Sequence, residues 1–198
     1  MTMSKNAKFD REEIIDKATN LYWEKGYHGT SMRDLQATVD LRPGSIYAAF
    51  GSKDNLFKEA VNHYAKTNGE LLQLCLDETN TPLSGLKLFI KKITIDSKGK
   101  APNDMCMLIK SISELTEKDN LELLNEAKAL QNGFELRLSQ IITQAKEVGE
   151  IAPTKDVMEL ARFVQIQIIG LRTYSRVNSD LKIVEKFIDD LFLTSPFK

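Results

Sequence analysis

The chain has 198 residues and a formal net charge of −1, with 42% hydrophobic and 28% charged residues. This length suffices for one large or two small domains, and the composition is typical of a soluble globular protein. No apolar run reaches the length of a membrane span and the first residues lack the apolar core of a signal peptide, so we expect a cytoplasmic protein.

The first predicted helix follows Asp10. This residue suits the N-cap, and Glu13, three positions later, completes a capping box. Gly26 suits a left-handed C-cap. Between them, apolar residues recur at the spacing of one helix face: Ile14, Ile15, Ala18, Leu21 and Tyr22. The pattern predicts an amphipathic helix that ends at Gly26.

Two shorter helices follow, separated by a tight break at residues 39–43. The second helix begins at Thr30 or Ser31, and Asp34 is placed to reach back to the cap. Pro43 suits the first position of the third helix, because its fixed φ and missing N–H fit there. We expect the third helix to turn three side chains inward: Ile46, Tyr47 and Phe50. Such a helix-turn-helix places its second helix in the major groove of DNA.

Helical spacing continues over the rest of the chain, and strand patterns are almost absent. Ser52 caps a fourth helix that runs to about Leu76, and Thr81-Pro82 begin a fifth that ends near Asp96. An exposed loop follows at residues 97–103. Four more helices are predicted near residues 104–116, 118–148, 154–177 and 180–193. The fold class is therefore all-α, with about nine helices in two parts: a three-helix head (residues 7–66) and a larger helical body (residues 67–198).

The spacing of seven residues in the head resembles the tetracycline-repressor (TetR) family of bacterial transcription regulators. The family pattern is Gly-x-x-x-Thr, then a short helix and a turn, then Gly-x-x-Tyr-x-x-Phe-x-x-Lys-x-x-Leu. The matching residues here are Gly26, Thr30, Gly44, Tyr47, Phe50, Lys53 and Leu56. Residues 47–53 and 104–108 resemble one branch of the family. The resemblance implies a head that binds DNA and a body that binds a ligand and a second copy of the chain.

The resemblance implies that Tyr47 and Lys53 contact the DNA backbone. Lys53 also begins a helix, whose free N–H groups favour a phosphate. We expect further backbone contacts from the start of the second helix and base contacts from the exposed side of the third, where Arg42 suits guanine. The expected DNA-binding set is Thr30, Ser31, Arg33, Arg42, Pro43, Gly44, Ser45, Tyr47, Ala48 and Lys53.

Charge alone does not indicate a DNA partner, because residues 1–65 hold nine Lys or Arg and nine Asp or Glu. DNA binding requires these basic groups to gather on one face. The head also departs from the family pattern: Asp40 stands at the usual turn glycine, and Arg42 and Pro43 replace the usual Ser and Lys. Asp tolerates the left-handed conformation, so we expect the turn to form while the base contacts differ.

The last two predicted helices are apolar on more than one side. Residues 160–171 are apolar on nearly every face, and the final helix carries a wide apolar stripe. A helix at the end of a chain should keep a polar half, so we expect a partner surface there, and the resemblance implies a twofold homodimer. The expected interface residues are Phe163, Ile166, Ile169, Val184, Phe187, Ile188 and Leu191.

A small-molecule inducer site is implied inside the body. Such sites are apolar cavities with a few polar groups. The expected lining residues are Phe89, Met105, Met107, Leu108, Phe134, Phe163, Gln167, Leu171 and Tyr174. Each of them is also compatible with a plain core position.

The chain has two cysteines, Cys75 and Cys106, and two histidines, His28 and His63, and these four residues lack the spacing of metal ligands. Two cysteines are also too few for a disulfide framework. We therefore expect no metal and no cofactor. Cys106 is predicted near a helix start with Lys110 one turn later, which favours a thiolate that senses oxidants or electrophiles. Asp104 opposes a thiolate, and free cysteines are usually small buried hydrophobes. Both interpretations stay open.

The leading interpretation is a transcriptional repressor that binds a palindromic operator as a homodimer and is released by a small-molecule inducer. An activator, or a regulator without an inducer, is the alternative within this class. An all-helical enzyme is not expected, because no cluster of catalytic residue types stands out in the sequence. A protein-interaction module would leave the spacing in the head unexplained. Salt-dependent binding to a palindromic DNA fragment separates the regulator from both.

Overall fold

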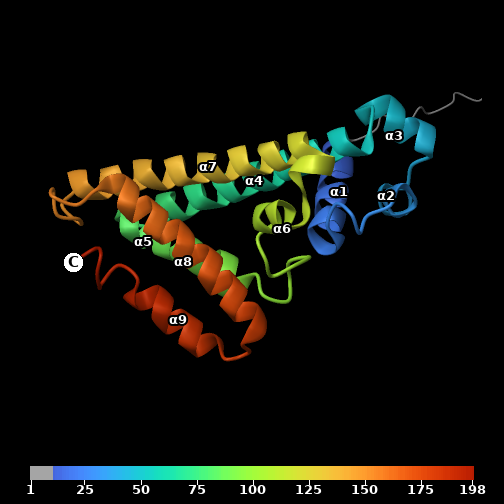
Figure 1. Ribbon diagram of the computed structural model, residues 1–198. Coiled ribbons are helices and arrows are strands. Elements are labelled where there is room, and N and C mark those ends of the chain that lie inside the picture. The colour runs from blue at the N-terminus through green and yellow to red at the C-terminus, as the bar shows by residue number, and fades with distance from the viewer. Residues whose placement is uncertain (1–10) are drawn as a thin grey trace, which may run out of the picture.

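The computed structural model describes residues 11–198, in which all regular elements are helices and there is no strand. Nine α-helices and one short π-helical turn (η1) form this part of the chain, in the predicted order (Figure 1). They are α1 (Arg11–Lys25), α2 (Met32–Val39), α3 (Pro43–Phe50), α4 (Lys53–Asp77), α5 (Pro82–Lys91), η1 (Lys92–Asp96), α6 (Met107–Glu114), α7 (Glu117–Glu147), α8 (Val157–Val177) and α9 (Leu181–Asp190). The all-α prediction is confirmed, while the cap predicted at Asp10 lies outside the described residues.

The predicted local signals of the head are present. Ser31 and Asp34 form a capping box at α2: the Asp34 N–H donates to the Ser31 hydroxyl at 3.1 Å, and the Ser31 N–H donates to the Asp34 carboxylate at 2.9 Å. Asp40 closes α2 in the left-handed region, with φ 54°. Arg42 is extended before Pro43, the first residue of α3. The backbone conformations of these residues determine how α3 is oriented relative to α2.

The head and the body share one core where they meet. Buried residues of the first four helices pack with residues of α6 and α7, among them Tyr22, Leu35, Ile46, Phe57, Met107 and Leu123. Gly26 ends α1 with φ 82° and lies so close to α6 that a Cβ there would come within 2.4 Å of a Glu114 carboxylate oxygen. Helix α4 also runs without a break past residue 66, the expected domain boundary. The head therefore packs directly on the body.

The body is built on the two long helices α4 and α7. They lie side by side and run from the head to the far end of the molecule (Figure 1). Helices α5 and α8 pack against them, and α9 packs on α5 and α8. A second core fills the space between these helices, with Leu72, Phe89, Leu138, Ile142, Val164 and Ile188 among its members. Within residues 11–198, no helix combines the length and the apolar character that crossing a bilayer requires.

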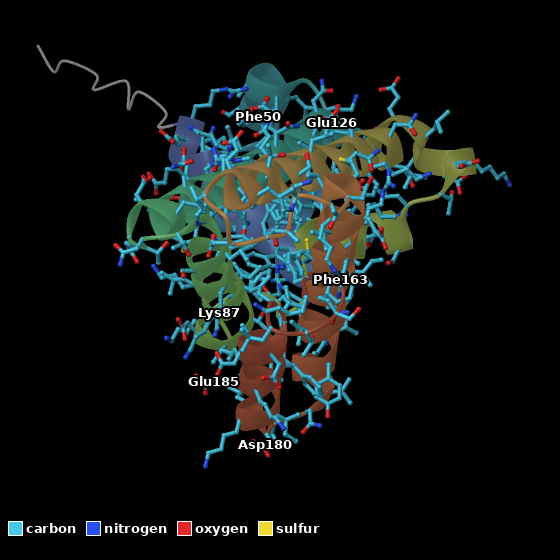
Figure 2. All side chains as sticks on the ribbon, turned by 90° about the vertical axis from the view of Figure 1, so that its left-hand side faces the viewer. Phe50, Lys87, Glu126, Phe163, Asp180 and Glu185 are labelled. Atoms are coloured by element: carbon cyan, nitrogen blue, oxygen red, sulfur yellow. The ribbon has the colours of Figure 1, made fainter. Side chains whose placement is uncertain are left out.

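Helix α9 is fixed to α5 by charge and by its buried side. Lys87 pairs with Asp189 at 2.9 Å, and Lys91 pairs with Glu185. Figure 2 shows Lys87 on α5 and Glu185 on the neighbouring α9. The predicted apolar stripe of α9 is partly a core face, which corrects the expected dimer interface. Three residues expected there are buried within the chain itself: Val184, Ile188 and Leu191.

Candidate functional site

Helix α3 presents one continuous exposed face. Four of its residues share this face: Pro43, Gly44, Tyr47 and Ala48. The opposite face is buried through Ile46 and Phe50. The expectation that Tyr47 points inward is wrong: its side chain is 50% exposed, because it lies about 100° around the helix from Ile46. An exposed helix face of this kind can enter the major groove of DNA, which admits an α-helix.

Residues beside α3 extend this face. Ser31 and Arg33 on α2 and Arg42 before α3 are exposed, and Ser45 is half-buried. Thr30 is a correction to the expected set. It is fully buried, and its hydroxyl donates to the carbonyl of the residue that ends α1 at 2.6 Å. This bond completes the turn after α1, so the side chain has no surface to offer a phosphate.

Lys53, the first residue of α4, is held against Tyr27. Its ammonium donates to the Tyr27 carbonyl at 2.8 Å and lies 4.1 Å from the centre of the Tyr27 ring. Burial lowers the pKa of Lys53. The Tyr27 hydroxyl in turn donates to Asp54 at 2.5 Å. Because an ammonium has further N–H donors, Lys53 can support the head and meet a phosphate at the start of α4.

Asp34 is a carboxylate beside this face, and its charge is balanced locally. The Ser31 hydroxyl and the Lys25 ammonium, which lies 2.9 Å away, hold the pKa of Asp34 well below its usual range. The exposed cations Arg33 and Arg42 have no acidic partner of this kind among the described residues. The surface around α3 therefore offers cations to a polyanion although the head is neutral overall.

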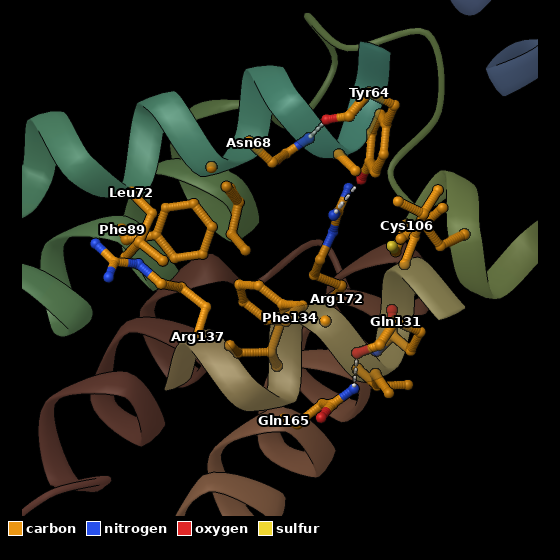
Figure 3. A pocket seen from close by; sticks show the side chains of 18 of the residues that line it. Tyr64, Asn68, Leu72, Phe89, Cys106, Gln131, Phe134, Arg137, Gln165 and Arg172 are labelled. Atoms are coloured by element: carbon orange, nitrogen blue, oxygen red, sulfur yellow. Dashed lines mark hydrogen bonds between the residues drawn. The ribbon is translucent and has the colours of Figure 1, made fainter. Parts of the chain in front are cut away.

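A second candidate site is a cavity of about 310 Å³ in the body, between α4, α5, α7, α8 and the start of α6 (Figure 3). Most of its wall is apolar. Three residues expected at a ligand site line it: Phe89, Leu108 and Phe134. A concave apolar wall with a few polar groups is typical of small-molecule sites.

Three side chains form a polar end of this cavity: Tyr64, Cys106 and Arg172. Arg172 is only 4% exposed. Its Nη1 donates to the Tyr64 hydroxyl at 3.1 Å, and its Nε donates to the Asp104 carbonyl at 3.1 Å. Burial raises the pKa of the Tyr64 hydroxyl, which is therefore neutral at physiological pH. The sequence patterns did not identify Tyr64 or Arg172. The one signal in the sequence was the position of Arg172, directly after the apolar segment of residues 160–171.

Further polar groups lie around the same cavity. Asn68 donates to the Tyr64 carbonyl at 2.9 Å, and the Gln165 amide donates to the Gln131 carbonyl at 3.1 Å. The side-chain oxygen of Gln165 is buried and has no partner within the described chain. Arg137 is half-buried and donates to the side chain of Gln73 at 2.6 Å. The polar groups of the wall are thus few and mostly paired.

Six residues expected to line the ligand site lie elsewhere, which corrects that part of the prediction. Met107 belongs to the core between head and body, and Leu171 to the core of the body. Phe163 packs on Phe197, and Tyr174 is exposed. Met105 and Gln167 are half-buried outside the cavity wall. Among residues 11–198, no cluster of His, Cys, Asp or Glu has the geometry of a metal site.

Helix α6 connects this cavity to the end of α1. Just before α6, the Met105 carbonyl accepts from the Trp23 indole N–H at 2.6 Å. Lys110 donates to the carbonyls of Trp23 and Glu24, at 3.1 Å and 2.6 Å. Near its end, Glu114 accepts from the backbone N–H that follows α1, at 2.7 Å. Lys110 is thus engaged by α1 rather than by the Cys106 thiol, which corrects the expected pairing.

The outer side of α8 and α9 exposes apolar side chains. Ile166 is 65% exposed and Phe187 is 56% exposed, whereas Phe163 and Ile169 are half-buried. Ile183, which belongs to the predicted apolar stripe of the last helix, is exposed too, as are Val177 and Leu193. Several large apolar groups on one pair of helices are typical of an interaction surface.

Comparison with known proteins extends these observations. Residues 14–60 match the family described as bacterial regulatory proteins, tetR family. The chain is 30% identical over 179 residues to the HTH-type transcriptional repressor ComR of Escherichia coli, covering 88% of this chain and 83% of ComR. It is 23% identical to the uncharacterized HTH-type regulator YezE of Bacillus subtilis, over 94% of this chain and 96% of YezE.

A solved structure has the same fold. The regulator CifR, in a cysteine mutant complexed with a 26-bp operator duplex, superposes with a TM-score of 0.84 at 23% identity. The superposition covers 96% of this chain and 98% of CifR. The two proteins therefore share one fold over almost their whole length.

Proposed function

The chain belongs to the tetR family of bacterial regulatory proteins, and we propose that it acts as a repressor. It is a DNA-binding transcriptional regulator and not an enzyme. The observation that carries the proposal is the exposed face of α3, flanked by the starts of α2 and α4. The repressor ComR, similar over 88% of this chain, supports repression rather than activation. Residues 7–66 act as the DNA-binding domain and residues 67–198 as the ligand-binding and dimerisation domain.

The head binds DNA through two kinds of contact. Tyr47, Ser31, Arg33 and Lys53 hold the phosphate backbone, which supplies most of the affinity. The face of α3 enters the major groove, where Arg42 pairs with guanine, and Pro43, Gly44, Ser45 and Ala48 pack against the base edges. Gly44 suits close approach, because it is exposed and has no side chain.

The functional unit is a homodimer on a palindromic operator. One head reads only a few base pairs, so two heads on two half-sites are needed for specificity. The exposed apolar side chains of α8 and α9 supply the interface, centred on Ile166 and Phe187 and extended by Phe163 and Ile169. A stable interface of this kind buries at least about 1,000 Å².

A small-molecule inducer bound in the body cavity releases the protein from DNA. The polar end of the cavity includes Cys106 of the segment before α6, and Arg172 is bonded to the same segment through the Asp104 carbonyl. Helix α6 is bonded to the end of α1 through Trp23, Lys110 and Glu114. A ligand that moves the segment before α6 therefore changes the position of the heads. We place the protein in the cytoplasm, where its operator lies.

Selection from a random-sequence duplex library tests this function. Full-length protein is expected to enrich an inverted repeat whose half-sites lie about one helical turn, or a multiple, apart. Enrichment of no sequence, or of a motif without twofold symmetry, would contradict the proposal. Binding must also weaken steeply with salt, because phosphate contacts release counterions.

A thiol-based sensor is the second candidate, and one observation favours it. Cys106 lines the cavity beside Tyr64 and Arg172, so modification of its thiol would place a new group where the inducer binds. Iodoacetamide alkylates a thiol by forming a carbon–sulfur bond with loss of iodide and a proton. Sensing predicts that this reagent weakens operator binding in the wild type and in Cys75→Ser, but not in Cys106→Ser. Equal loss in Cys106→Ser would exclude it.

A further inference from the structure

The body cavity contains a buried cation, and the one carboxylate of the described residues that acts on its charge, that of Asp104, forms no ion pair with it. No carboxylate among residues 11–198 forms an ion pair with Arg172, which is almost completely buried. Its two hydrogen bonds go to neutral oxygens, the Tyr64 hydroxyl and the Asp104 carbonyl. A guanidinium has several further N–H donors in a planar fork, so part of its binding capacity is unused.

This cation is charged at neutral pH. Burial alone would lower the pKa of Arg172, but interactions with Tyr64, Cys106 and the Asp104 carboxylate outweigh it, and the pKa lies above its ordinary value. Tyr64 supplies no negative charge at neutral pH, because burial raises the pKa of its hydroxyl. A buried charge without a directly paired counter-ion is costly to the folded state, so a structural role explains Arg172 poorly.

The rest of the wall points to the same ligand chemistry. Figure 3 shows a second guanidinium, that of Arg137, at the other end of the cavity. Within residues 11–198 its side chain donates only to the neutral amides of Gln73 and Gln140. The described residues that line the cavity include no Asp and no Glu. Between the two cations the wall is apolar, with Leu72, Phe89 and Phe134. An anionic head group on an apolar body would complement this wall in charge and in polarity.

We propose that the cavity binds a small organic acid, with its carboxylate on Arg172 and its apolar body against Phe89 and Phe134. This proposal rests on the proposed function, because it names the chemical class of the inducer. The guanidinium fork matches a carboxylate with two parallel hydrogen bonds. The cavity volume of about 310 Å³ lies at the lower end of ligand pockets, which suits a medium-chain or arylalkyl acid.

The bound acid would also reach the α6 connection. Its carboxylate would share Arg172 with the Asp104 carbonyl, which lies just before the Met105 carbonyl that accepts from Trp23. Competition for the guanidinium therefore acts on the segment that links the cavity to α1. An uncharged ligand of the same shape would not compete for the guanidinium and so would not act on this segment.

Isothermal titration calorimetry on the full-length protein tests the proposal. The probes are octanoate and octanamide, which have the same chain length and differ in charge. Octanoate is expected to bind the wild type at least ten times more tightly than octanamide, and Arg172→Met is expected to reduce this ratio to within twofold. Arg176→Met is the matched control on the same helix: Arg176 is exposed and outside the cavity wall, so the ratio should not change.

Three results would overturn the proposal: no octanoate binding by the wild type, equal affinity for both probes, or an unchanged ratio in Arg172→Met. Should Arg172→Met fail to fold by circular dichroism, Arg172→Lys decides. It keeps the charge but loses the fork, so octanoate should bind more weakly than to the wild type and still more tightly than octanamide. Wild-type octanoate affinity, or a preference for octanamide, would overturn the proposal.

The failure of this proposal is distinguishable from the failure of the proposed function. The calorimetry needs no DNA, whereas the proposed function depends on selection of an inverted repeat. Selection of a repeat together with no octanoate binding overturns the acid proposal alone. Octanoate binding by a protein that selects no DNA sequence overturns the repressor and leaves the acid site in place.

Discussion

The DNA-binding surface and the body cavity are built in opposite ways. The surface takes its residues from one stretch, residues 31–53, whose caps, turn and proline set its shape locally. The cavity takes its wall from five helices, between Tyr64 on α4 and Arg172 on α8. The surface therefore depends on short-range signals, whereas the cavity exists only after the body has packed.

The two regions also differ in their burial. The exposed residues of α3 contribute little to the core, so substitutions there should change DNA binding without changing stability. The cavity wall is part of the core of the body, so substitutions there change both. The following predictions use this difference, beginning with the largest effect.

Phe187→Asp is expected to separate the dimer. The side chain is 56% exposed on α9, so a charge there costs the monomer little but opposes an apolar interface. Operator affinity should fall about 100-fold or more, because a single head lacks specificity. Sedimentation and fluorescence anisotropy measure the two effects. Leu136→Asp, at an equally exposed apolar residue of α7, is the control. A dimeric Phe187→Asp would contradict the proposed interface.

Arg42→Ala is expected to relax the choice of base at one operator position. Loss of a bidentate contact to guanine should reduce the binding free energy by about 1–3 kcal/mol for the operator that carries this guanine, and by less for operators with another base there. Anisotropy titrations against single-base variants of the operator measure this difference, and the melting temperature should not change because Arg42 is exposed. A uniform loss across all sequences would make Arg42 a backbone contact instead.

Tyr47→Phe is expected to weaken binding to all sequences alike by a few-fold. The change removes the hydroxyl that is proposed to reach a phosphate and keeps the ring, which is half-exposed. Because the hydroxyl is neutral and its loss releases no counterion, the slope of log affinity against log salt should stay unchanged. A change in base preference would show that Tyr47 reads the groove.

Gly133→Ala is expected to stabilise the protein by about 0.5–1 kcal/mol, because glycine is a poor helix former. Gly133 lies inside α7 at the cavity, and a Cβ there meets no other atom within 4 Å. Gly85→Ala on α5 is the contrast: its Cβ would lie 2.8 Å from the Leu76 Cα, so this variant should be destabilised. Urea unfolding distinguishes them. Equal changes in both variants would contradict the described packing.

The sequence predicted the parts of the molecule that local chemistry controls. Ser31 and Pro43 act within one or two turns of chain, and the left-handed Asp40 needs no distant partner, so their roles were correctly predicted. Tyr47 was placed inward because it adjoins Ile46 in sequence, although the helix turns it to the surface. Thr30 matched the family pattern, but its hydroxyl serves the turn after α1.

The cavity could not be predicted to the same extent. Phe89, Leu108 and Phe134 were expected there, but apolar residues at helical spacing give no sign of whether they line a cavity or fill a core. Met107 and Leu171 shared this pattern and belong to the core. The residues that carry its chemistry come from helices far apart in sequence. Their meeting depends on the packing of α4 and α8 against α7.

Specific operator binding is measured by the affinity of the wild-type protein for its selected inverted repeat and for a shuffled duplex of the same composition, at physiological salt. We expect the repeat to bind at least about 1,000 times more tightly, as specific DNA-binding proteins do. The complex should contain two chains per duplex. Equal affinity for the two duplexes would contradict the account.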